Sequence, residues 1–99
     1  MLHIVNKSPM EKASLQTCLD TAASGGAVLL IEDAVYAATR GNAAETSLRK
    51  AMSKLEIYAL GPDLEARGMA GALAEGVKLV DYAGFVELVV KHDTCQSWL

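Results

Sequence analysis

Short apolar segments with the length and composition of β-strands recur along the chain. Their apolar residues run continuously instead of alternating with polar ones, which is typical of a parallel sheet whose two faces are both covered. The pattern predicts strands at residues 2–5, 27–31 and 55–60, a weaker strand at 77–80, and a last edge strand in the tail at 94–99.

Between these segments the apolar residues follow the period of amphipathic helices. Helices are predicted at 13–24, at 46–54, at 63–68 and after Asp81, which is expected to cap the last one. The first helix has one apolar face, formed by Leu15, Cys18, Leu19 and Ala22.

Strands that alternate with helices predict an α/β fold. We expect a small three-layer α/β/α sandwich with a mainly parallel sheet of four to five strands. The periodicity does not give the order of the strands in the sheet.

The length of 99 residues predicts one domain over residues 1–99. Hydrophobic residues make up 52% of the chain, compared with about 45–50% in ordinary domains. A domain of this size has little interior, so part of its apolar surface is expected to contact a partner. Alone, the chain is expected to form homo-oligomers or aggregates.

Charged residues are spread along the chain without runs. Nine basic and twelve acidic residues give a net charge of −3, so no direct binding of nucleic acid or anionic lipid is expected. The first residues lack the basic stretch of a signal peptide and the long apolar core of a membrane anchor, which predicts a cytoplasmic protein. Two cysteines are too few for a disulfide scaffold and are expected to be reduced.

Two adjacent carboxylates, Glu32 and Asp33, follow the second predicted strand. The carboxyl ends of parallel strands form the edge of a sheet at which α/β folds bind ligands, so this pair is a candidate site at that rim. The alternative, which we favour, is that Asp33 caps the helical turn at 34–38 and that Glu32 is a solvated or interface residue. Tyr36 and Trp98 are further rim or interface candidates.

Several kinds of site lack their sequence motif in this chain. Residues 6–11, after the first strand, have neither the pattern of a flavin-phosphate loop nor the Gly-rich lysine motif of a nucleotide-binding loop. The third strand ends in Leu60 and Gly61, where a phosphoacceptor domain would have an aspartate. His3 and His92 lack metal-ligand spacing with either cysteine. We therefore expect neither a cofactor nor a metal ion.

Cys18 and Cys95 are the two residues that could form a thiolate nucleophile. Cys18 lies on the apolar stripe in the middle of its helix, with no basic residue beside it, so a buried and inert thiol is predicted. Cys95 lies in a polar tail and is expected to be exposed.

Four segments, in the same order along the chain, resemble the DsrH/TusB family of sulfur-relay subunits. They are LHIVNKSP at 2–9, LLIEDAVYAA at 29–38, YALGPDLEARG at 58–68 and VDYAGFVELVVKHDTCQSWL at 80–99. The resemblance implies a DsrE-like α/β fold and a heterohexamer with two copies each of three homologous subunits. The sister subunits would be of the DsrE/TusD type and the DsrF/TusC type. In such complexes a cysteine of the DsrE/TusD-type subunit holds sulfur as a persulfide and passes it to a DsrC/TusE-type carrier.

The resemblance implies a mainly structural and partner-recognition role, because residues 61–63, which correspond to the loop of the sister cysteine, contain no thiol. A cysteine at the position of Cys18 resembles the DsrH-type members of sulfur oxidisers and favours a role in sulfur oxidation. One alternative is a TusB-type role in tRNA wobble-uridine 2-thiolation. Another is a sulfurtransferase that carries persulfide on Cys18 itself. A third is a free-standing small-ligand binder that uses Glu32 and Asp33.

Overall fold

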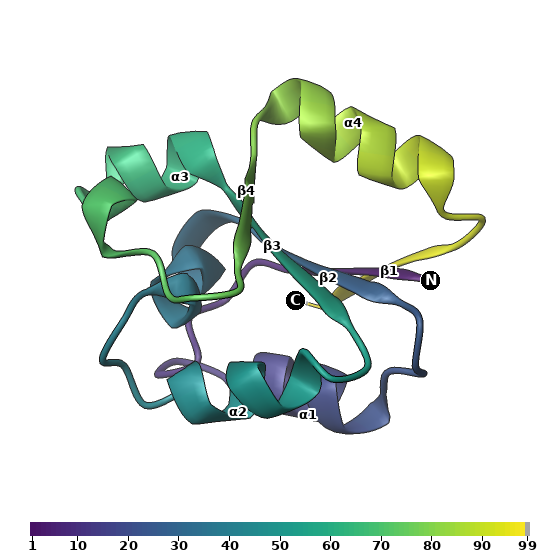
Figure 1. The fold of residues 1–99 in the computed structure, drawn as a ribbon, viewed down its shortest axis with the longest axis horizontal. Helices are drawn as coiled ribbons and strands as arrows, with labels where there is room; N and C mark the ends of the chain where they lie inside the picture. Colours follow the sequence, from purple (N-terminus) through teal and green to yellow (C-terminus); the bar gives the residue numbers. More distant parts are fainter. Residues whose placement is uncertain (99) are drawn as a thin grey trace.

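The computed structural model describes residues 1–98, which form one parallel β-sheet with helices on both faces (Figure 1). The strands are β1 (Leu2–Val5), β2 (Ala27–Leu30), β3 (Glu56–Leu60), β4 (Lys78–Val80) and β5 (Cys95–Trp98). All neighbouring strands are parallel, in the order β4-β3-β2-β1-β5. The predicted α/β fold is confirmed, and each strand lies within its predicted segment; residue 99 of the predicted tail strand lies outside the described residues.

The helices occupy the intervals between the strands. They are α1 (Ser14–Thr21), the 3-10 helix η1 (Glu32–Ala38), α2 (Glu45–Ala51), α3 (Gly61–Ala66), the short 3-10 helix η2 (Ala70–Ala72) and α4 (Tyr82–Lys91). Asp81 caps α4 as predicted, because its Oδ1 accepts a hydrogen bond from the backbone N–H of Gly84 at 2.8 Å. Within residues 1–98 no helix is long and apolar enough to cross a membrane.

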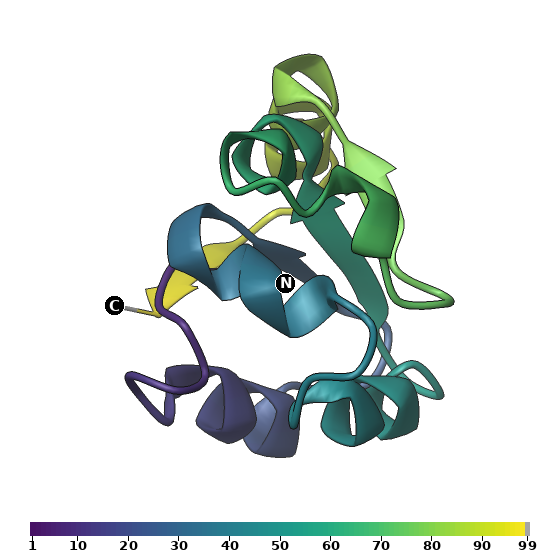
Figure 2. The same ribbon diagram turned by 90° about the vertical axis from the view of Figure 1, so that its left-hand side faces the viewer.

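The sheet lies between two layers of helices (Figures 1 and 2). α1 and α2 contact each other and lie against one face, whereas α4 lies against the other. α3 follows β3 and packs against η1 at the carboxyl ends of the strands. These layers are the three that the alternation of strands and helices predicts.

The two faces of the sheet are covered to different extents. All four side chains of β2 are buried, and Val28 and Leu30 belong to a large apolar cluster on the side of α1 and α2. On the α4 side, Ala27 and Leu29 belong to a much smaller buried cluster. Its partly exposed neighbours are Ile4, Ile31, Tyr58, Val80 and Phe85. The α4 face is therefore less completely covered than the apolar runs predict.

The two edge strands, β4 and β5, expose most of their side chains. β5 brings the chain back to β1, and the backbone N–H of Leu2 donates to the carbonyl oxygen of Thr94 at 2.9 Å. A strand that pairs on one side only buries less of its surface. This explains why these two strands have the weakest apolar signal in the sequence.

Candidate functional site

The carboxyl ends of β2 and β3 lead into η1 and α3, which bring together residues about thirty positions apart. The backbone N–H of Glu32 donates to Oδ2 of Asp63 at 2.6 Å. Arg67 donates to Oδ1 of Asp33 from Nε at 3.0 Å and from Nη2 at 2.9 Å. A third guanidinium nitrogen, Nη1 of Arg67, donates to the carbonyl oxygen of Asp63 at 3.2 Å. These four residues form the rim cluster, which joins η1 to α3.

The expectation that Asp33 caps the turn after β2 is wrong. The N-cap residue of η1 is Ile31, and no side chain caps this helix. Asp33 lies in the first turn, where its carboxylate is half exposed and pairs with Arg67. Local sequence patterns cannot reveal this pair, because its members are 34 residues apart. Asp33 therefore attaches η1 to α3 instead of capping η1.

Glu32 is the one non-glycine residue with a positive φ angle, 49°, within the described chain. Its carboxylate is exposed, so its side chain is not held in the protein interior. Side chains disfavour this left-handed conformation, which persists where the surroundings determine it. Here the hydrogen bond from the Glu32 N–H to Asp63 fixes the backbone as the chain turns from β2 into η1.

Residues 61–63, between the end of β3 and the body of α3, form the first turn of α3. Pro62 lies at the start of this helix, where a backbone N–H has no partner within the helix. The lack of an N–H in proline therefore costs no hydrogen bond there. Asp63 complements the positive end of the helix and accepts the bond from Glu32. The segment is thus a short helical turn whose one ionisable side chain is the carboxylate of Asp63, and it contains no thiol.

Tyr36, in η1, is 40% exposed and borders a mostly apolar recess of about 270 Å³. The other lining residues come from the segment after β1 and from the segment before α2: Ser8, Pro9, Met10, Asn42, Ala43 and Ala44. Met10 is almost fully exposed at this recess. The recess is open enough for an apolar side chain, and the role of Tyr36 in an interface stays a prediction.

Cys18 is completely buried on the apolar face of α1, as the sequence predicts. Burial raises the pKa of its thiol to about 11, and the positive charge of Lys54 acts weakly in the opposite direction. Lys54 follows α2 and lies far from Cys18 in sequence, so the periodicity of α1 could not reveal it. At neutral pH the Cys18 thiol is therefore protonated and shielded from solvent.

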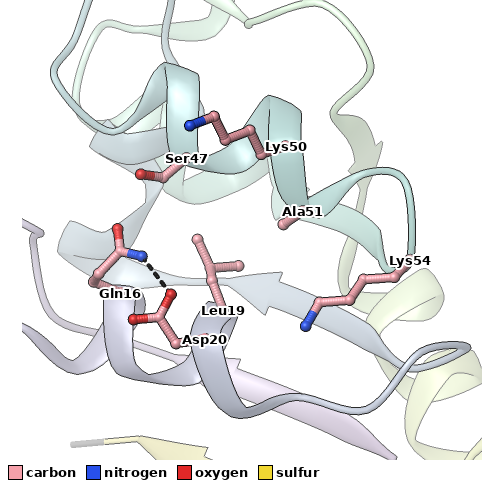
Figure 3. Close-up of a pocket in the computed structure, with 7 residues that line it drawn as sticks. All are labelled: Gln16, Leu19, Asp20, Ser47, Lys50, Ala51 and Lys54. Atoms are coloured by element: carbon pink, nitrogen blue, oxygen red, sulfur yellow. Dashed lines mark hydrogen bonds between the residues drawn. The ribbon is translucent and has the colours of Figure 1, made fainter.

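A cleft of about 300 Å³ lies between α1 and α2 (Figure 3). Gln16 donates to Asp20 at 2.8 Å on the α1 side, and Lys50 lies on the α2 side. The amine of Lys54 points toward α1, where it donates to the carbonyl oxygen of Ala22 at 2.9 Å. The cleft carries both signs of charge, and no cysteine lines it. It lies away from the rim cluster, which the carboxyl ends of β2 and β3 form.

Trp98 is tied to β1 inside the chain. Its Nε1 donates to Nδ1 of His3 at 3.1 Å, and the two ring centroids are 6.1 Å apart. Burial, and then the charge of the N-terminus, lower the pKa of His3 and favour its neutral form. Trp98 is partly buried in this contact. Only the exposed part of its ring could therefore contact a partner, as the prediction of a rim or interface residue requires.

Cys95 lies exposed on the edge strand β5, as predicted. Among residues 1–98 no three His, Cys, Asp or Glu side chains are close enough to hold a metal ion. The structure therefore offers a rim cluster of charged side chains and two separated thiols, of which one is buried.

Comparison with known proteins agrees with this architecture. Residues 7–95 match the family model described as DsrH like protein. Protein TusB of Escherichia coli K12 is 39% identical over 98 residues, which cover 99% of this chain and all of that protein. Protein TusB of Shigella sonnei strain Ss046 is also 39% identical over the same length.

Two solved structures share the fold at low sequence identity. The crystal structure of the ychN protein from E. coli aligns with a TM-score of 0.80 at 18% identity, over 97% of each chain. The protein of unknown function MTH1491 from Methanobacterium thermoautotrophicum aligns with a TM-score of 0.72 at 17% identity, over 97% of this chain and 95% of that one. These two likenesses concern the fold alone. The family model and the full-length relatives show that the chain belongs to the DsrH/TusB family.

Proposed function

We propose that this chain is a structural and partner-recognition subunit of a cytoplasmic sulfur-transfer complex. A cysteine of a DsrE/TusD-type sister subunit would hold the persulfide, a DsrF/TusC-type sister would complete the assembly, and a DsrC/TusE-type carrier would receive the sulfur. The observation that carries the proposal is the first turn of α3. Where the resemblance places the sister cysteine, this chain has a turn without a thiol, which Asp63 attaches to Glu32.

The state of the thiols supports this division of labour. A cysteine that accepts sulfur must be reachable and must ionise, because the thiolate is the nucleophile. Cys18 is fully buried, and burial raises its pKa to about 11. Persulfide chemistry on Cys18 would require α1 to move away from the sheet. The second candidate function, in which this chain itself carries sulfur on Cys18, therefore needs a conformational change on assembly with the sister subunits.

The rim cluster argues against a free-standing ligand binder. The Asp33 carboxylate already pairs with Arg67, and Asp63 already accepts the N–H of Glu32. A ligand at Asp33 or Asp63 would have to compete with Arg67 or with the Glu32 N–H for the carboxylate. A monomer that binds a small ligand at micromolar concentration without sister subunits would favour that function instead.

Two physiological settings suit such a subunit. The cysteine at position 18 favours sulfur oxidation through its resemblance to DsrH-type members. Similarity over the full length to proteins named TusB favours tRNA wobble-uridine 2-thiolation. Because the first argument rests on one buried residue and the second on the whole chain, we favour thiolation. Expression of this chain in a bacterium that lacks its own TusB should restore 2-thiouridine in tRNA, whereas a role confined to sulfur oxidation predicts no restoration.

The direct test compares reconstituted complexes that contain wild-type chain or the Cys18→Ala variant. Persulfide delivery to the carrier should be nearly equal for the two complexes once both are shown to be intact by size-exclusion chromatography. Replacement of the sister cysteine in the same complex serves as the control and should abolish delivery. Loss of nearly all transfer in Cys18→Ala, with a sulfur adduct mapped to Cys18 in the wild type, would make this chain a sulfur carrier.

Thiol labelling gives an independent measurement on the folded chain. Two single-cysteine variants form a matched pair, Cys95→Ser, which retains Cys18, and Cys18→Ala, which retains Cys95. The variant that retains Cys95 should react rapidly with a maleimide, and the one that retains Cys18 should react only as fast as the protein unfolds locally. Equal rates under native conditions, with equal rates in denaturant, would contradict the buried state of Cys18.

A further inference from the structure

β5 is joined to the sheet through β1 alone, and one of its side chains makes a specific contact there. It is an edge strand whose neighbour in the sheet is β1. Cys95, Gln96 and Ser97 are exposed, whereas Trp98 packs against the large apolar cluster. Nε1 of Trp98 donates to Nδ1 of His3, which is only 6% exposed on β1. The contact between Trp98 and His3 is therefore the main side-chain attachment of β5.

This hydrogen bond requires the neutral form of His3. An indole N–H can only donate, so Nδ1 of His3 must carry a lone pair, and in the neutral ring the proton is then on Nε2. A protonated imidazole has an N–H group at both nitrogens and cannot accept a hydrogen bond. Uptake of one proton by His3 would thus place two donors against each other, Nε1–H of Trp98 and Nδ1–H of His3.

We propose that β5 is a pH-sensitive edge strand, which protonation of His3 releases from β1 while β1 to β4 stay paired. Release withdraws the indole of Trp98 from His3 and lets water reach the charged imidazole. It also leaves the outer edge of β1 unpaired, and an unpaired strand edge is a surface to which strands of other chains can add. The movement is local and does not depend on the role of the chain in sulfur transfer.

The strands on either side of His3 place no charge against it. Its partners in register are Val28 of β2 and Gln96 of β5, and both side chains are uncharged. Cys95, the titratable residue of β5, comes directly before Gln96 and therefore points to the other face of the sheet. Protonation of His3 is thus governed by groups outside β2 and β5.

α1 lies over the same face and carries two titratable side chains. Cys18 stays uncharged, because burial raises the pKa of its thiol to about 11. Asp20 is exposed and lines the cleft between α1 and α2. Burial, and then the positive charge of the N-terminus, lower the pKa of His3 below its ordinary value of 6.5. β5 is therefore fully attached above about pH 6.5 and is released progressively as the pH falls toward the folded-state pKa.

The indole of Trp98 gives a direct signal in NMR, because it is the single tryptophan of the chain. On acidification of the full chain, its N–H resonance should shift with the same midpoint as the ring resonances of His3. At about pH 7.5, nitrogen spectra of His3 should show the tautomer with the proton on Nε2. Trp98→Phe, which keeps an aromatic ring and removes the donor, should raise the pKa of His3. A neutral His3 with its proton on Nδ1, or an indole resonance indifferent to the titration of His3, would overturn the inference.

Amide hydrogen exchange separates release of β5 from unfolding of the whole domain. After correction for the intrinsic exchange rate, protection of β5 should fall by up to about tenfold per pH unit below about pH 6.5. Low concentrations of urea should leave the exchange of β5 nearly unchanged, because a local opening exposes little surface, and should accelerate the exchange of β2.

Two variants show which histidine is responsible. His3→Gln should remove the pH dependence of β5 exchange, because glutamine does not titrate. His92→Gln is the matched control, since His92 follows α4 outside this contact, and it should leave that dependence in place. Protection of β5 that does not change with pH in the wild type would overturn the inference. Exchange of β5 with the urea dependence of β2 would overturn it too, because β5 would then open only with the whole domain.

Discussion

The backbone of Glu32 has a left-handed conformation, which is unfavourable by about 1–2 kcal/mol for residues other than glycine. The residue lies between two elements, at the end of β2 and the start of η1, and Asp63 accepts its N–H from a third. The unfavourable φ angle of Glu32 is therefore a consequence of the hydrogen bond that joins η1 to α3. The exposed carboxylate of Glu32 has no part in holding that angle, since the hydrogen bond comes from the backbone.

Replacement of Glu32 by glycine should therefore stabilise the protein. Relief of the strained angle outweighs the greater entropy of glycine in the unfolded chain, so Glu32→Gly should raise the free energy of unfolding by up to about 1 kcal/mol. Glu32→Ala is the matched control, because it removes the same carboxylate and keeps the Cβ atom, and it should leave stability nearly unchanged. Urea denaturation measures both; a larger gain from Ala than from Gly would show that the carboxylate, not the backbone, is the unfavourable feature.

His3 should make stability depend on pH between neutral and mildly acidic conditions. Its Nδ1 must be unprotonated to accept the bond from Trp98, and burial lowers its pKa below 6.5. The unfolded chain thus takes up the proton at higher pH than the folded chain. The stabilisation is complete above about pH 6.5 and is lost as the pH falls toward the folded-state pKa. The pKa of His92 is also lowered by burial, so this residue acts in the same direction.

The free energy of unfolding, measured by denaturation at several pH values between about pH 7.5 and about pH 5, should show this loss. The fluorescence of Trp98, the single tryptophan of the chain, can report the unfolding. His3→Gln should flatten the dependence partly, and His3→Gln combined with His92→Gln should flatten it further. A dependence in His3→Gln as steep as in the wild type would contradict the coupling of His3 to Trp98.

The elements of this fold were predictable from sequence because each depends on neighbours within a few residues. The period around Cys18 predicted both α1 and a buried thiol, and Asp81 was identified as the cap of α4. The contacts between elements were not predictable in this way. Asp33 has the residue type of a cap and follows a strand, yet it lies inside the first turn of η1 and its partner is Arg67, 34 residues away. The strand order likewise depends on pairings that no local pattern encodes.

Two aspartates that precede or begin helices should accordingly respond differently to alanine. Asp81 accepts the N–H of Gly84, so Asp81→Ala should lower the free energy of unfolding by about 0.5–2 kcal/mol, and Asp81→Ser should restore most of it. Asp33 forms a half-exposed ion pair, so Asp33→Ala should cost less than about 1 kcal/mol. High salt should reduce the effect of Asp33→Ala only. Equal, salt-independent losses would show that Asp33 acts through η1 itself.

Over the whole molecule, burial decreases from the middle of the sheet to its edges and from the α1 and α2 face to the α4 face. β2 is buried on both faces, whereas β4 and β5 pair on one side and expose most of their side chains. The smaller cluster under α4 leaves Ile4, Ile31 and Tyr58 partly exposed. The side that is least covered within the chain also carries the exposed α4 side chains Tyr82, Val86 and Val90, so the two sides of the sheet differ in how much apolar surface they expose.

This gradient predicts the order of amide hydrogen exchange. Amides of β2 and their partners in β1 and β3 should exchange slowest, by opening of the whole domain, and amides of β4 and β5 should exchange faster, by local opening. Mass spectrometry of peptides after exchange can separate these strands. Equal protection of β5 and β2 in the isolated chain would show that the edge is held by contacts beyond those with β1.

The return of β5 to β1 has a consequence for synthesis on the ribosome. β1 to β4 can pair one after another as they emerge, since each is adjacent in the sheet to the strand made before it. The outer edge of β1, in contrast, stays unpaired until β5 has been translated. An unpaired strand edge readily pairs with other chains, and contacts between distant parts of a chain form slowly. Mispairing between nascent chains at the edge of β1, more than unfolding of the finished protein, should therefore limit its yield.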